Sequence, residues 1–146
     1  MPGFALPERY ASFLRLLSDT QEFSAQMPEY TKRDGAAIIY AFNSLFDIAW
    51  KLMKDSLLEY YGFDNVKPTP RDIIRKAASA GLISNEAEWL AMLKNRNLST
   101  HDYMSTNHQY YCGQIDADYL PLMNQFKEAI QLQIDELAAE DADDGH

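Results

Sequence analysis

The segment from Leu93 to Tyr103 contains the side chains of this sequence that are best suited to chemistry. It combines a guanidinium at Arg96, an amide at Asn97 and an imidazole at His101. A histidine can move a proton near neutral pH, and an arginine can stabilise charge that develops on a phosphorus centre. Cleavage of a phosphodiester without a metal needs these two kinds of group.

The spacing of these residues sets a geometric condition on such chemistry. Asn97 and His101 are four residues apart, so on a continuous helix they are neighbours and the amide can orient the imidazole. Arg96 and His101 are five residues apart, which is roughly 140° around a helix. They meet if the helix loosens near Thr100, if Arg96 reaches around, or if two copies of the chain face each other. The same pattern also suits a solvated helix end capped by a histidine.

Helical periodicity predicts the elements that position this segment. Apolar residues recur at spacings of three and four along most of the chain, and no alternating strand pattern is present. Gly113 and Pro121 predict a kink in the last helix or its division into two pieces. We therefore expect an all-α fold, an antiparallel up-down four-helix bundle with a short extra helix. The predicted helices span about residues 7–27, 34–61, 69–81 and 106–138, and a further helix begins at residue 84 and includes residues 89–93.

Charge is distributed unevenly along the 146 residues. The chain has 13 basic and 22 acidic side chains and a net charge of −9, but the segment from Asp135 onward holds six acidic and no basic residues. We expect one domain over residues 1–137 and an acidic, disordered tail over 138–146. The overall charge excludes general attraction to RNA or to an anionic membrane. Any RNA contact must therefore be local, and Arg96 is the first candidate.

Several classes of protein are excluded by what the sequence lacks. The single cysteine, Cys112, excludes an internal disulfide, and the longest charge-free apolar run, Gly35 to Phe46, is too short to span a bilayer. These two features predict a cytoplasmic protein. We expect no metal or other cofactor, because no Cys, His and Asp cluster has metal-ligand spacing. The chain also lacks the Gly-Ser pair and spaced aspartates of a nucleotidyltransferase, so it is not itself that enzyme.

A group of basic side chains outside this segment has two interpretations. They could form a rim that binds RNA or a partner subunit, or they could be a solvated face with intrahelical pairs, which is commoner. The group consists of Lys51, Lys54, Arg71, Arg75 and Lys76.

Six segments, in order, resemble the nucleotidyltransferase substrate-binding proteins, members of the HEPN superfamily of small helical-bundle proteins. The resemblance covers roughly residues 8 to 137. The chain departs from it at Asn43 and Asp47, where relatives often carry Glu in the long helix. The segments are 38–43, 47–55, 69–75, 80–83, 89–93 and 96–103.

The resemblance implies a homodimer that works with a separately encoded minimal nucleotidyltransferase. In related HEPN toxins, an arginine and a histidine matching Arg96 and His101 form an RNase site at the dimer interface. Asn97 matches the polar residue that often follows the arginine, and Asp102 is a second supporting candidate. In toxins of the HepT kind, a tyrosine at the position of Tyr103 accepts AMP from the partner enzyme, which silences the toxin.

Two functions from different classes follow from the same segment. The chain is either a toxin-type, metal-independent endoribonuclease acting on tRNA or mRNA, or a non-catalytic subunit that presents substrate or itself to the nucleotidyltransferase. A structural dimer without RNase activity is a third interpretation. The sequence does not separate these alternatives.

Overall fold

The computed structural model of the protein describes residues 5–25, 32–101 and 108–144. Over these residues the chain forms helices and no strand, so the expectation of an all-α fold is confirmed. The elements are α1 (Ala5–Ala25), α2 (Lys32–Glu59), α3 (Pro70–Ala80), α4 (Glu86–His101), α5 (His108–Gln114), the π-helical turn η1 (Ile115–Tyr119) and α6 (Leu120–Asp144).

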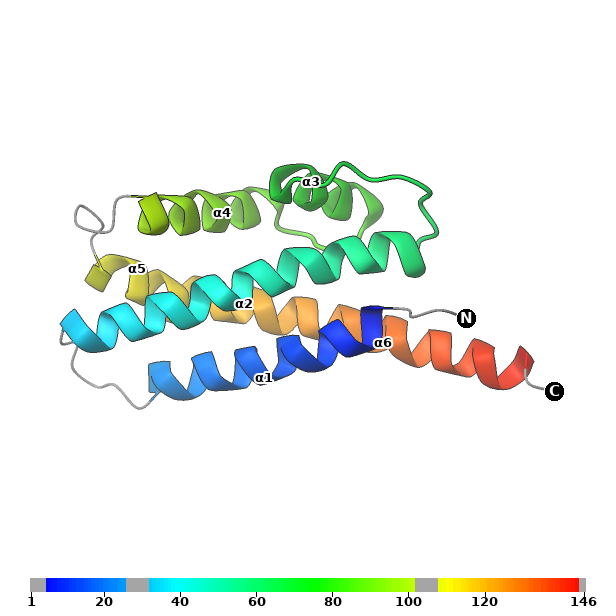
Figure 1. The fold of residues 1–146 in the computed structure, drawn as a ribbon, viewed down its shortest axis with the longest axis horizontal. Helices are drawn as coiled ribbons and strands as arrows, with labels where there is room; N and C mark the ends of the chain where they lie inside the picture. The colour runs from blue at the N-terminus through cyan, green and yellow to red at the C-terminus, as the bar shows by residue number, and fades with distance from the viewer. Residues whose placement is uncertain (1–4, 26–31, 102–107, 145–146) are drawn as a thin grey trace.

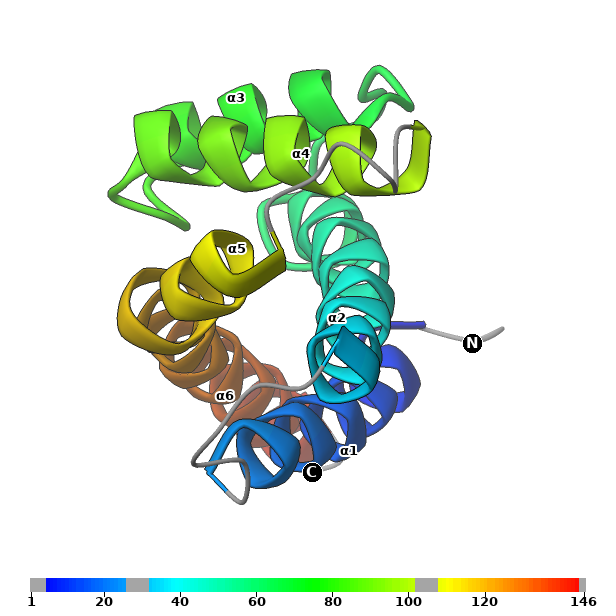
Figure 2. The same cartoon turned by 90° about the vertical axis from the view of Figure 1, so that its left-hand side faces the viewer.

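The long helices run alternately in opposite directions (Figure 1). α1 and α2 lie side by side, and α5, η1 and α6 form one helical path that returns along them. Viewed end-on, α3 and α4 form a layer above α2 and α5, and α1 and α6 lie below (Figure 2). α4 therefore lies at the outer edge of the molecule, where one of its faces is exposed to solvent (Figure 2).

A chain of buried aromatic rings joins the four long helical segments. Phe13 of α1 meets Phe126 of α6 with ring centroids 5.6 Å apart, and Phe126 meets Trp89 of α4 at 5.6 Å. Trp89 in turn lies 6.4 Å from Phe46 of α2. The contacts of Phe126 with Phe13 and Trp89 are edge-to-face, a geometry that stabilises more than its buried area alone. They fix the start of α4 against the core and so determine where its second half lies.

α2 is the central helix of the molecule. By length and composition alone, Asp34–Glu59 could cross a membrane, but half of its most apolar window is buried against the other helices. That burial is what a core helix requires, since its apolar residues contact several neighbours at once.

The predicted irregularity of the last helix takes the form of the turn η1. Pro121 has no N–H to donate and its ring crowds the preceding turn. The N–H of Leu120 bonds to the carbonyl of Ile115, five residues back, so the helix widens by one residue just before the proline. The helical path thus continues from α5 to α6 without a loop.

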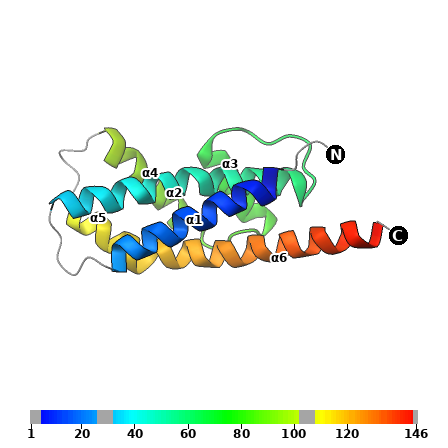
Figure 3. The same cartoon turned by 60° about the horizontal axis from the view of Figure 1, so that its bottom comes forward.

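The end of the chain differs from the expected disordered tail. α6 continues to Asp144, so residues 138–144 are helical. Figure 3 shows this end of α6 extending past the ends of α1 and α2. The alanines among the acidic residues favour helix, and an existing helix is extended at low cost because its nucleus is already formed.

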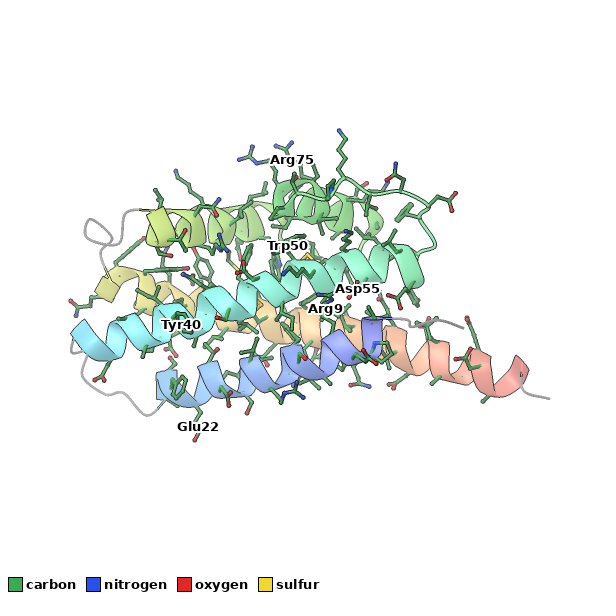
Figure 4. The ribbon with its side chains drawn as sticks, in the orientation of Figure 1. Arg9, Glu22, Tyr40, Trp50, Asp55 and Arg75 are labelled. Carbon is green, nitrogen blue, oxygen red and sulfur yellow. The ribbon has the colours of Figure 1, made fainter. Side chains whose placement is uncertain are left out.

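An ion pair between Arg9 of α1 and Asp55 of α2 should contribute measurably to stability (Figure 4). Burial raises the pKa of Asp55, and the guanidinium of Arg9 opposes that shift. Replacing Arg9 by Ala would leave a buried carboxylate without its partner, and we expect a loss of about 2 kcal/mol in the free energy of unfolding. Urea denaturation measures this loss. Arg15→Ala, an exposed position on the same helix, is the control, and equal losses in both variants would contradict the assignment.

Candidate functional site

α4 places the predicted site residues on one unbroken helix. The helix runs from Glu86 to His101, so it is continuous over Asn97 and His101 and places them one turn apart. The helix does not loosen before Thr100, which removes one of the routes by which Arg96 and His101 could meet within one chain. The side chain of His101 lies outside the described part of the structure, and so do residues Asp102 and Tyr103.

Arg96 is held against α2 by a carboxylate. Its Nη2 lies 2.9 Å from both oxygens of Asp47. Its Nη1 donates to the Oδ1 of Asn97 at 3.3 Å. The Nε of Arg96 is buried, and no acceptor for it occurs among the described residues. Because the two charged side chains are 29% and 38% exposed, the pair orients the guanidinium more than it stabilises the fold.

A chain of hydrogen bonds fixes the backbone at Arg96. The hydroxyl of Tyr111 on α5 donates to the Oδ1 of Asn43 on α2 at 2.9 Å. Asn43 Nδ2 then donates to the Oγ of Ser99 at 2.9 Å, and that hydroxyl donates to the carbonyl of Arg96 at 2.8 Å. Burial raises the pKa of the Tyr111 hydroxyl, so it keeps its proton and remains a donor at neutral pH. α2 and α5 thus hold one short stretch of α4.

The other side of α4 is tied to the π-helical turn. Asn95 Nδ2 donates both to the hydroxyl of Tyr119 and, at 3.3 Å, to the Oε1 of Gln114. The ring of Tyr119 stacks on Phe42 with centroids 5.7 Å apart. η1 therefore places the hydroxyl of Tyr119, which accepts a hydrogen bond from Asn95, against α4. This contact lies where the helix widens from α-helical to π-helical hydrogen bonding.

One known protein family matches most of the chain. The family described as "Nucleotidyltransferase substrate binding protein like" matches residues 8–132, most of the chain. The chain belongs to this family. The matched region contains all of α2, α4 and α5, and therefore the whole described polar network around Arg96. The family's name associates its members with a nucleotidyltransferase.

A solved structure shares the fold. The crystal structure of a protein from Thermus thermophilus superposes with a TM-score of 0.70 at 23% sequence identity, covering 81% of this chain and 98% of that one. At this identity the likeness concerns the fold alone. None of the curated proteins matches the chain.

The network around Arg96 uses residues that the motif alone did not single out. Asn43 and Asp47 stand out in the sequence as departures from the Glu of relatives, and the structure gives both a partner on α4. Their signal is a pair of polar residues four apart on a largely apolar helix. Ser99 lies within the motif without an evident role. Nothing in the sequence distinguishes Tyr111, since a tyrosine at helical spacing is usually a buried core residue.

The described residues contain no group of three or more His, Cys, Asp or Glu side chains that could hold a metal ion. The network around Arg96 is built instead from amide, hydroxyl and guanidinium groups and the single carboxylate of Asp47. Such a site can bind and orient an anion and stabilise charge on it. A proton-transfer group must come from elsewhere, and His101 follows on the same helix.

Removing the hydroxyl of Tyr111 tests whether the hydrogen-bond chain is a real constraint. We expect Tyr111→Phe to lower the free energy of unfolding by about 1 kcal/mol, because the Oδ1 of Asn43 loses its donor. Thermal denaturation should show a fall of roughly 2–4 °C.

Tyr110→Phe is the matched control, because Tyr110 is the preceding residue on α5 and 66% exposed. It should leave the melting temperature nearly unchanged. An unchanged melting temperature for Tyr111→Phe would show that the chain of hydrogen bonds adds nothing to stability.

Proposed function

We propose that this chain is the partner subunit of a two-component minimal nucleotidyltransferase system, a HepT-like toxin of the HEPN superfamily that acts in the cytoplasm. One observation carries the proposal. Within the region matched to the family, Arg96 is oriented by α2 and followed by His101 on the same unbroken helix. This is the pair of groups that metal-independent RNA cleavage needs.

The geometry of α4 favours a site shared by two copies of the chain. Arg96 and His101 lie roughly 140° apart around a continuous helix, so one phosphate is not readily reached by both from the same protomer. Two exposed apolar side chains, Tyr40 at 78% and Leu98 at 51%, lie close in sequence to the Asn43–Ser99 contact. Tyr40 points outward from α2 in Figure 4. We propose that this surface pairs with itself in a homodimer of antiparallel four-helix bundles.

In the proposed reaction His101 acts as the general base. It takes the proton of a ribose 2′-hydroxyl as that oxygen attacks the adjacent phosphorus, and the bond to the 5′-oxygen of the next nucleotide breaks. The leaving 5′-oxygen takes up a proton from solvent water, and the proton on His101 later returns to solvent, so the products are a 2′,3′-cyclic phosphate and a 5′-hydroxyl. Arg96 stabilises the charge on the non-bridging oxygens. Asn97 and Asp102 support the pair, and the substrate is a tRNA or an mRNA.

Tyr103 supplies the proposed control. Its hydroxyl attacks the α-phosphorus of ATP held by the partner nucleotidyltransferase, a phosphodiester to AMP forms, and pyrophosphate leaves. Because Tyr103 follows His101 by two residues, the added phosphate places a negative charge beside the site and competes with RNA for its cation. The toxin would then be silent.

A second function is favoured by the pairing of Arg96 itself. Its guanidinium already binds the carboxylate of Asp47, which leaves less of it free for a phosphate. This pairing suits a subunit that only presents substrate or itself to the nucleotidyltransferase, or a structural dimer. In either case Arg96 would remain paired with Asp47 at all times.

RNA cleavage distinguishes these functions. Purified wild-type protein, Arg96→Ala and His101→Ala would be incubated with tRNA in EDTA, and the fragment ends analysed. We expect the wild type to leave cyclic phosphate ends and both variants to be slower by about 10²-fold or more. Arg75→Ala, an exposed arginine on α3, should cleave like the wild type. RNA that stays equally intact in all samples would refute the nuclease function.

The same assay addresses Tyr103. Protein co-expressed with the separately encoded nucleotidyltransferase should carry adenylyl mass increments and should have lost its cleavage activity. Tyr103→Phe should show neither change, whereas Tyr110→Phe should show both. Increments that persist in Tyr103→Phe would move the acceptor role to another residue.

A further inference from the structure

A groove crosses the outer face of α4 and begins beside Arg96. Its larger part, about 780 Å³, lies between α4 and the first residues of α3, and a smaller cavity of about 180 Å³ lies between α4 and α2. Pro70, Leu93 and Asn97 line both, so the two adjoin each other. The larger part alone has the size of a typical small-ligand site. Its walls are mostly apolar, with Leu90 and Leu98 among them.

The charge of the groove is opposite to that of the protein as a whole. Arg71 and Lys94 line the larger part, and Lys51 and Arg96 line the smaller. Asp47 is the one carboxylate among these described lining residues, and it is paired with Arg96. The chain has 13 basic and 22 acidic residues, yet residues 63–100 carry six basic ones (Lys67, Arg71, Arg75, Lys76, Lys94, Arg96) and four acidic ones (Asp64, Asp72, Glu86, Glu88).

An aromatic ring stands at the end of the groove that contains Arg96. Trp50 lines the smaller cavity and is partly exposed, and the ammonium of Lys51 lies 5.9 Å from the centre of its ring. In Figure 4 Trp50 lies on the side of α2 that faces α3 and α4. An aromatic ring beside cations binds nucleobases and phosphates together, because the ring stacks on the base while the cations hold the backbone.

We propose that this groove binds a nucleoside phosphate, free or as part of a single RNA strand. The base packs against Trp50 and the apolar wall at Leu93, and a phosphate lies at Lys51 and Arg96. The strand continues along the groove to Lys94 and Arg71. The inference rests on the proposed function, because it names the path by which RNA would reach Arg96. An acidic peptide fits the cations and the apolar wall equally, but it has no use for the ring of Trp50.

Binding is measured on the full-length His101→Ala protein, in which cleavage is blocked. The probe is a fluorescein-labelled twelve-residue oligouridylate, followed by fluorescence anisotropy at physiological salt. Added Arg71→Glu or Lys94→Glu should each raise the dissociation constant about tenfold, since each reverses a charge that contacts phosphate. Arg75→Glu is the matched control. It makes the same substitution one turn further along α3, at a residue that lines a different cleft. It should change the constant by less than about threefold, because salt screens distant charges.

Three further ligands identify the occupant. An abasic strand of the same length should bind about tenfold more weakly than oligouridylate, because it cannot stack. Competition by ATP would indicate a free nucleotide, and its failure to compete would indicate a strand. An oligoglutamate peptide should not displace the probe.

The proposal is overturned by any of four results: no binding of oligouridylate or ATP, equal effects of Arg71→Glu and Arg75→Glu, equal binding of the abasic strand, or displacement by oligoglutamate. Circular dichroism of each variant establishes that it is folded. The outcomes are distinct from those of the cleavage assay. Groove-dependent binding without cleavage by the wild type would refute only the nuclease. Cleavage that is unaffected by Arg71→Glu and Lys94→Glu would refute only the groove.

Discussion

The pairing of Arg96 with Asp47 is the interaction on which the site depends. It is the one described ion pair that joins α4 to α2, and it determines which way the guanidinium of Arg96 points. The pair is too exposed to stabilise the fold strongly. Its effect is to keep a cation at a fixed place on the surface, beside the groove and five residues before His101.

The uncharged hydrogen-bond network behind this pair explains how a weak ion pair can hold Arg96 in one defined position. Tyr111, Asn43 and Ser99 satisfy one another and the carbonyl of Arg96 inside a largely apolar interface. A hydrogen-bond chain in such surroundings is costly to break, because each group would lose its partner without gaining water. It therefore selects one register of α4 on α2. Binding a phosphate at Arg96 then requires only that Asp47 share its partner, and no helix needs to move.

Much of the fold could be predicted from the sequence, because helix boundaries are set by local signals. α3 begins after Thr69, whose side chain accepts a hydrogen bond from the backbone N–H of Asp72, and it ends at Gly81, which adopts the left-handed conformation. The site was predicted less completely. Arg96 and Asn97 were identified by their chemistry, but the carboxylate that pairs with Arg96 comes from Asp47 on α2, 49 residues away. Side-chain pairing over that distance follows from packing, and no pattern in the sequence encodes it directly. The helical end of α6 was missed because composition predicts whether a segment can form a core, not whether it can extend a helix.

Because α4 is unbroken through His101, the proposed RNase site combines Arg96 of one chain with His101 of the other. Mixed dimers of Arg96→Ala and His101→Ala protomers, refolded together and assayed on tRNA in EDTA, test this arrangement. Each variant alone should be inactive. If Arg96 of one chain works with His101 of the other, each mixed dimer contains one intact site and cleavage returns. Mixed dimers that form, as shown by mass, but stay inactive would contradict the account.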